Sequence, residues 1–109
     1  MQIQHKNLAA GKWYTLSLIE QMANIGSEIS RAARWQNKDD RLFKSATDRA
    51  LELLDLTIQD RRWRNRLKEI VRIREILADA ILGGQEYRSS FEDLDRYFFY
   101  FALAARINM

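Results

Sequence analysis

The sequence contains no cysteine and no proline, and only four glycines among its 109 residues. The absence of cysteine excludes a disulfide framework and thiolate chemistry, which suits a reducing cytoplasm. Proline and glycine interrupt helices more strongly than other residues, so their scarcity predicts an all-α protein. A chain of this length corresponds to one domain, and its 47% apolar content is enough for a hydrophobic core.

Histidine is nearly absent too, since His5 is the only one in the sequence. Two-metal sites in helical bundles usually need Glu-x-x-His pairs, and none exists, so we expect no metal and no cofactor. Nucleophile–base pairs made of cysteine or histidine cannot form, and there is no glycine-rich phosphate loop. Lysine or carboxylate pairs remain possible in principle, but no pocket-like cluster is visible. We expect no enzymatic activity and no small-molecule substrate.

Long hydrophobic runs are missing as well. The uncharged stretch at residues 97–105 is far shorter than the ~20 residues that span a bilayer. The first residues contain no apolar segment of the signal-peptide type. We therefore expect a soluble, cytoplasmic protein with no membrane partner. Its formal net charge of +3 permits a nucleic-acid partner without requiring one.

Apolar residues recur at helical spacing in four segments of the chain. Asp60 is a candidate N-cap, Gly83-Gly84 is a helix stop, and Ser90 with Asp93 matches a capping-box start. Four helices with short connections predict an antiparallel up-down-up-down four-helix bundle. The expected elements are an N-terminal arm at residues 1–12 and helices at about 13–36, 39–59, 61–82 and 90–107.

Two of these helices carry informative faces. The first has a stripe of mostly small residues around Gly26, which would let a partner helix approach closely. The same helix also carries a row of polar residues, Glu20, Asn24, Glu28 and Arg31. This row is most simply a solvated face, in which Glu28 and Arg31 form a surface pair. The third helix is expected to point Trp63, Leu67, Ile70, Val71, Leu77 and Ile81 inward.

The last helix is apolar on every side over residues 97–105, where five of nine residues are aromatic. One face suits the bundle interior, and the other needs a second cover. Burying a single Phe side chain is worth about 1.5–3 kcal/mol, so aromatic side chains left in water favour self-association. The alternative is a monomer in which the second apolar face of the last helix is exposed to solvent. The expected oligomer interface consists of Tyr97, Phe99, Tyr100 and Leu103.

The start of the third helix is strongly basic. Seven lysines and arginines and two glutamates give segment 61–75 a formal charge of +5. Cations at helical spacing can follow a phosphate backbone, and Trp63 within the run could stack on a base, although a core position is the simpler interpretation. Alternatively, the arginines pair with acids of the second helix, namely Asp48, Glu52 and Asp55. The candidate nucleic-acid-binding residues are Arg61, Arg64, Lys68 and Arg72.

The segment Ala23-Asn24-Ile25-Gly26-Ser27-Glu28 is similar to an Asn-Ile-Ala-Glu-Gly stretch in one known group of proteins. With its length and helix pattern, the chain resembles the four-helix-bundle family encoded in intervening sequences of large-subunit ribosomal RNA genes. That family is related to the accessory variability determinant of diversity-generating retroelements. The resemblance implies a ring-like homopentamer. It also implies nucleic-acid binding through a basic surface, here the face from Arg61 to Arg74.

Two functions are compatible with these patterns. The first is a non-enzymatic, homo-oligomeric bundle whose basic face binds RNA or DNA. The alternative is a structural scaffold or protein-interaction module in which the same arginines pair with acids across subunits.

Overall fold

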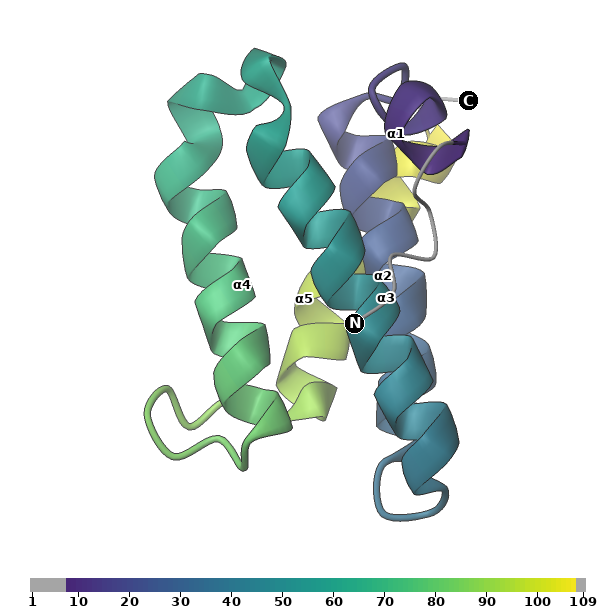
Figure 1. Ribbon diagram of the computed structural model, residues 1–109, viewed down its shortest axis with the longest axis vertical. Helices are drawn as coiled ribbons and strands as arrows, with labels where there is room; N and C mark the ends of the chain where they lie inside the picture. Colours follow the sequence, from purple (N-terminus) through teal and green to yellow (C-terminus); the bar gives the residue numbers. More distant parts are fainter. Residues whose placement is uncertain (1–7, 108–109) are drawn as a thin grey trace.

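The computed structural model describes the backbone of residues 8–107 and the side chains of residues 11–107, and the regular secondary structure of this part of the chain consists of helices, with no strand. The predicted all-α class is confirmed. The long helices run alternately down and up the molecule (Figure 1). The elements are α1 (Leu8–Trp13), α2 (Leu18–Trp35), α3 (Asp40–Gln59), the 3-10 helix η1 (Arg61–Arg66), α4 (Leu67–Ile81) and α5 (Phe91–Ile107).

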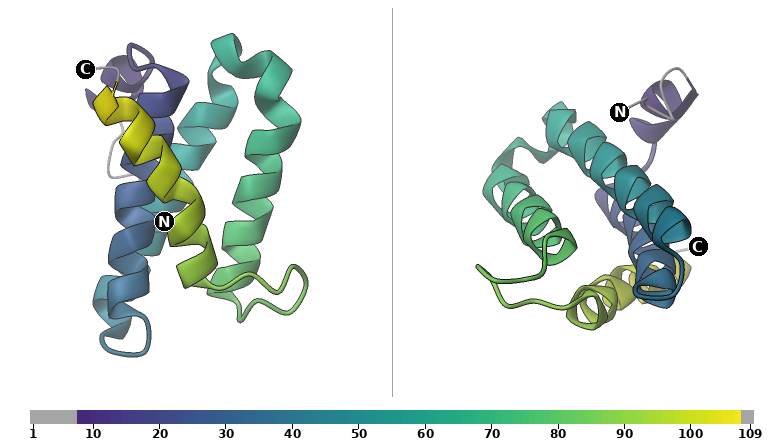
Figure 2. Two further views of the ribbon diagram at one scale, coloured as in Figure 1. Left: turned by 180° about the vertical axis from the view of Figure 1, so that it is seen from behind. Right: turned by 60° about the horizontal axis from the view of Figure 1, so that its bottom comes forward.

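Helix α2 is the central element, because it packs against both α3 and α5. Its apolar stripe is buried as expected, with Ile25, Ile29 and Ala32 fully shielded from solvent. Helix α4 packs on α3 at the far side. The four long helices therefore form an arc with α4 and α5 at its two ends (Figure 2, right).

Helices α4 and α5 approach each other closely only near their connecting loop and then diverge (Figure 2). A groove of about 280 Å³ remains between them, and its walls include Ile73, Ile76, Leu94 and Tyr97. Because the described residues leave this side of the arc open, the closed four-helix bundle stays a prediction.

The first long helix begins later than predicted, at Leu18 instead of residue 13. The Ser17 hydroxyl accepts a hydrogen bond from the Glu20 backbone N–H, and the Glu20 carboxylate accepts one from the Ser17 N–H. This capping box satisfies two N–H groups that a helix start leaves free, so the helix begins there. Helix α1 begins within the segment predicted as an arm and ends at Trp13, whose side chain is buried in the core. Residues 1–7 of the predicted arm lie outside the described residues.

The break between α3 and the third predicted helix is at Asp60, as expected. Asp60 ends α3 and caps the next element, but that element is the 3-10 helix η1, with non-helical dihedral angles at Trp63 (φ −101°, ψ 23°). The predicted continuous helix from residue 61 is therefore wrong, and the α-helix begins at Leu67.

This change of helical geometry explains the one misplaced core residue of that segment. Leu67 was expected to point inward, but it is 40% exposed because the preceding 3-10 turns rotate the start of α4. Trp63, Val71 and Ile81 are half-buried. Ile70 and Leu77 are buried as predicted.

The α4–α5 connection follows its predicted signals. Gly83 and Gly84 have positive φ angles of 116° and 73°, which end α4. The Asp79 carboxylate then accepts hydrogen bonds from the backbone N–H groups of Glu86 and Tyr87, which ties the loop to α4. These contacts fix the place where α5 starts.

Helix α5 begins with reciprocal hydrogen bonds between Ser90 and Asp93, both of 3.1 Å. It crosses α2 at Gly26, whose missing side chain lets Phe98 approach: an added Cβ would lie 2.8 Å from the Phe98 Cβ. The small-residue stripe of α2 therefore admits a helix of the same chain.

Candidate functional site

Three cations of the basic run have partners within the chain. The Arg62 guanidinium donates to the Asp60 carboxylate at 2.7 and 3.0 Å and to the Leu16 carbonyl at 2.6 Å. Arg66 pairs with Glu69 at 3.0 Å, one turn along the chain. Arg74 pairs with Asp55 of α3 at 2.6 Å. Each of these three guanidinium groups thus has a carboxylate partner within the chain.

The four candidate nucleic-acid-binding residues behave differently. Their side chains are exposed. None of them forms a hydrogen bond or ion pair with any residue that the structure describes. Arg61 and Arg64 lie on η1, whereas Lys68 and Arg72 lie on α4, so the change from 3-10 helix to α-helix at Leu67 divides them between two elements. The predicted single α-helical row is therefore replaced by a bent edge; we call Arg61, Arg64, Lys68 and Arg72 the basic edge.

The acidic stripe of α3 does not neutralise this edge within the chain. Asp55 takes Arg74, as the pairing alternative predicts. Asp48 instead pairs with Lys44 at 2.9 Å on its own helix, and Glu52 is buried. The pairing alternative thus accounts for Arg74 but for none of the four residues of the basic edge.

Trp63 is not a free stacking surface. Its indole N–H donates to the Gln21 side-chain oxygen at 2.9 Å, and its ring packs against the core. The Arg62 guanidinium lies 4.4 Å from the ring centroid, in a cation–π contact. The structural interpretation of Trp63 is confirmed.

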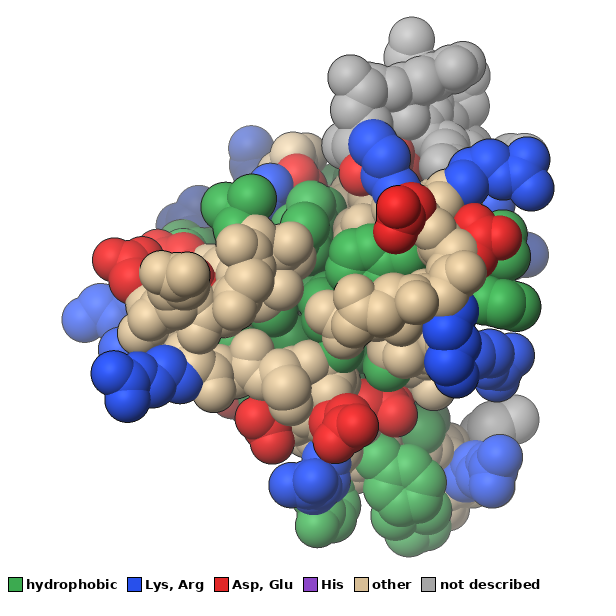
Figure 3. Space-filling model, turned by 90° about the horizontal axis from the view of Figure 1, so that it is seen from below, with side chains coloured by type: hydrophobic (Ala, Val, Ile, Leu, Met, Phe, Trp, Pro, Cys, Tyr) green, Lys and Arg blue, Asp and Glu red, His purple; other side chains and the backbone are tan. Residues whose placement is uncertain are grey.

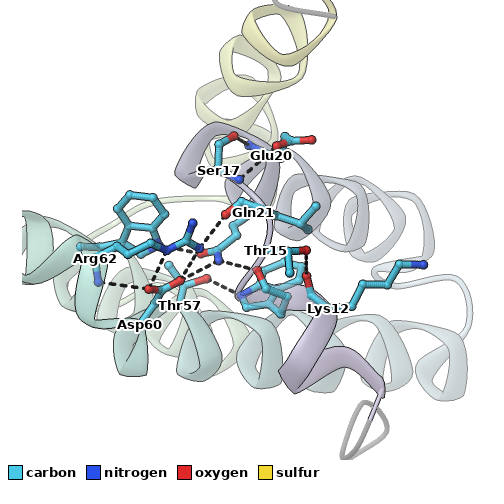
Figure 4. Close-up of polar contacts among 11 residues, drawn as sticks. Lys12, Thr15, Ser17, Glu20, Gln21, Thr57, Asp60 and Arg62 are labelled. Carbon is cyan, nitrogen blue, oxygen red and sulfur yellow. Dashed lines mark hydrogen bonds and ion pairs between the residues drawn. The ribbon is translucent and has the colours of Figure 1, made fainter.

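A buried polar network lies where α3 ends and η1 begins, next to the first residue of the basic edge (Figure 4). The Gln21 amide nitrogen donates to the Trp13 carbonyl at 2.8 Å and to the Asp60 carboxylate at 3.0 Å. The Trp13 indole donates to the Thr57 hydroxyl at 3.0 Å. Hydrogen bonds from Arg62, above all, hold the pKa of Asp60 below its usual value, and the contact with Gln21 acts in the same direction. The network joins α1, α2, α3 and η1 and fixes where η1 leaves α3.

The sequence analysis identified only part of this network. Asp60 is recognisable as a cap because it bonds locally to Arg62. Gln21 carries no such signal, because its partners lie 8, 39 and 42 positions away in the chain. A glutamine on the apolar side of a helix is the only hint that the sequence offers.

The four predicted interface residues are all exposed on the single chain. Tyr97 is 39% exposed, Phe99 55%, Tyr100 67% and Leu103 38%. Figure 3 shows hydrophobic side chains between basic ones along the edge of the molecule formed by α5. Partial burial raises the pKa of Tyr97, whose side chain lines the groove facing α4. The inward face of α5 is buried, with Phe91, Leu94 and Phe98 in the core.

The polar row of α2 has local partners. Glu20 belongs to the capping box, and Asn24 donates to the Glu20 carbonyl at 2.8 Å. Glu28 and Arg31 form the predicted pair at 3.1 Å. Among the described residues there is no cluster of three or more metal-ligating side chains. Within residues 8–107, each helix is too short or too polar to cross a bilayer.

A comparison with known proteins finds no matching family model, no matching curated protein and no matching solved structure. The family resemblance therefore remains an expectation that rests on residues 23–28, the chain length and the helix pattern.

Proposed function

We propose that this chain is a non-enzymatic, homo-oligomeric helical protein that binds RNA or DNA through the basic edge. In this proposal α2–α5 form the antiparallel four-helix unit, and the exposed residues of α5 are the surface through which copies associate. The family resemblance implies five copies. The observation that supports the proposal best is the contrast within one basic run: Arg62, Arg66 and Arg74 are paired, whereas the four residues of the basic edge have no hydrogen-bond or ion-pair partner in the described part of the chain.

This contrast favours phosphate binding for a physical reason. A cation already paired with a carboxylate must give up that partner before it can contact a phosphate. An exposed, unpaired cation gives up only water and counterions, and the release of DNA-bound counterions then drives association. The buried network beneath η1 holds the backbone that carries Arg61 and Arg64, so the edge is organised before any ligand arrives.

The test replaces Arg61, Arg64, Lys68 and Arg72 together by glutamine. Binding to fluorescein-labelled single-stranded RNA and duplex DNA is measured by anisotropy at low salt. A matched control replaces four cations near the opposite end of the molecule by glutamine, which removes the same net charge; these are Arg34, Lys38, Arg41 and Lys44. We expect the first variant to lose binding and keep its oligomeric mass, and the control to keep both.

The scaffold alternative predicts a different result. If the basic edge pairs with acids of neighbouring subunits, the first variant dissociates, and the wild-type protein shows no binding to either nucleic acid at low salt. The exposed apolar surface of α5 favours self-association under both functions, so light scattering on the first variant separates them.

A further inference from the structure

A furrow of about 350 Å³ opens between α2 and α5, on the side of α5 away from α4. Its floor is made of small side chains, including Ser27 and Ser30 of α2 and Ala102 of α5. Phe99 also lines it and is 55% exposed. A large apolar ring thus lies next to a depression that no large side chain of residues 11–107 fills.

Two opposite charges lie along the α5 wall of this furrow. Asp95 and Arg106 are about three helical turns, or roughly 16 Å, apart on one face of α5. Neither forms a hydrogen bond or ion pair with the residues that the structure describes. Phe99 and Ala102 lie between them, at equal distances from the midpoint. The same face thus carries an acid at one end, a base at the other, and a large and a small residue between them.

This order is complementary to itself when two copies of α5 run antiparallel. Around a two-fold axis at the midpoint, Asp95 of one copy faces Arg106 of the other, and the reverse pair forms by symmetry. The same axis places each Phe99 ring over Ala102 of the opposite copy, beside the small residues of α2. Two parallel copies would instead place Asp95 near Asp95 and Phe99 near Phe99.

We propose that the furrow between α2 and α5 is occupied by Phe99 of a second copy of this chain, in a two-fold, antiparallel α5–α5 interface closed by two Asp95–Arg106 ion pairs. This inference rests on the self-association in the proposed function and specifies its geometry. It gives a dimer of twice the 12.9 kDa chain mass, in contrast to the five copies that the resemblance implies. Leu103, one turn after Phe99, borders the interface.

Charge reversal tests this geometry with the full chain. Asp95→Arg places two arginines against each other twice per dimer, and Arg106→Asp does the same with two aspartates. Like charges in contact at an interface are costly, so we expect each variant to self-associate at least ~10-fold more weakly. In an equimolar mixture of the two variants, every pair across the interface becomes Arg against Asp. We therefore expect a heterodimer of wild-type-like affinity, measured by sedimentation velocity with one variant labelled.

Further variants test whether the Phe99 ring is buried in the furrow of the second copy. Phe99→Ala is expected to weaken the dimer at least ~10-fold, because fully buried aromatic side chains are typical interface hot spots. The control Leu82→Ala, at an apolar side chain that is 84% exposed at the end of α4, is expected to leave the dimer unchanged. Circular dichroism verifies that each variant is folded.

The possible failures are distinguishable. A wild-type chain that is monomeric at micromolar concentration overturns both this interface and the self-association in the proposed function. A wild-type oligomer whose reversed variants do not recover in the mixture, or whose mass is that of a ring, overturns the antiparallel interface alone. Loss of nucleic-acid binding in the basic-edge variant is measured independently of either result.

Discussion

Gln21 is completely buried, yet its amide has partners on both sides. The nitrogen donates twice, to Trp13 and Asp60, and the oxygen accepts from the indole of Trp63. A buried polar group is costly only when it lacks a partner, so this side chain stabilises the fold as long as its partners stay in place. Single residues of this network therefore determine how η1 and its cations are oriented.

Asp60 is the charged member of that network, and Asp60→Asn tests its contribution. Its pKa is lowered in the folded protein, so its stabilising effect is complete above the unfolded value, about 3.9. The effect is lost as the pH falls through the lower, folded pKa. The wild-type free energy of unfolding should therefore fall more steeply below about pH 4 than that of the variant. Near pH 7 the variant should be less stable by roughly 1–3 kcal/mol.

Urea unfolding at a series of pH values measures both effects. Glu86→Gln, at an exposed residue of the α4–α5 loop, serves as the control and should change neither quantity by more than ~0.5 kcal/mol. An Asp60→Asn protein with wild-type stability at neutral pH and the same acid dependence would show that the network does not depend on this charge.

At the scale of elements, most helix ends follow from local signals, whereas contacts between distant segments do not. Asp60, the Gly83-Gly84 pair and the Ser90 cap act within a few residues, so the sequence predicted those helix ends. The capping box at Ser17 is equally local, but the prediction placed the start of the helix at Trp13, where the apolar pattern begins. Trp13 lies in the core and its indole N–H donates a hydrogen bond to Thr57 of α3. The apolar residue at position 13 therefore reflects this packing and not a continuation of α2.

The crossing of α2 and α5 yields the element-scale prediction, because two glycines in helices have opposite surroundings. Gly26→Ala gains about 1 kcal/mol of helix propensity but places a Cβ 2.8 Å from the Phe98 Cβ, and overpacking of this kind costs typically 1–3 kcal/mol. We expect the crowding to dominate and the variant to be destabilised. In contrast, an added Cβ at Gly11 in α1 meets no atom within 4 Å, so Gly11→Ala should stabilise by up to ~1 kcal/mol.

Thermal and urea unfolding of the two variants, measured side by side, check the sign of each change. A stabilised Gly26→Ala protein would mean that α5 can move away from α2 without loss. In that case the close approach of the two helices would not be what positions the exposed residues of α5.

At the scale of the whole molecule, the sequence predicted which cations are candidates but not how they are placed. Charge and spacing identified Arg61, Arg64, Lys68 and Arg72, and the structure leaves these four exposed and unpaired among the residues it describes. The contact between Arg62 and Asp60 is local, but the bonds of Gln21 to Asp60 and Trp63 join residues 39 and 42 positions apart, so the sequence could not predict them. The 3-10 geometry of η1 changes the expected straight row of cations into a bent edge.

This arrangement predicts how binding depends on salt. If the basic edge neutralises four phosphates per copy, the slope of log K against log salt concentration should be about −3.6 on duplex DNA and about −2.8 on a single strand. Lys68→Gln should reduce the magnitude of the slope by about 1, because one counterion fewer is released. Arg66→Gln should leave the slope unchanged, since that guanidinium is already paired with Glu69. Anisotropy titrations between low and physiological salt measure this slope for the wild-type protein and both variants. An equal reduction of the slope in Lys68→Gln and Arg66→Gln would mean that the protein's overall charge, not the basic edge, attracts the nucleic acid.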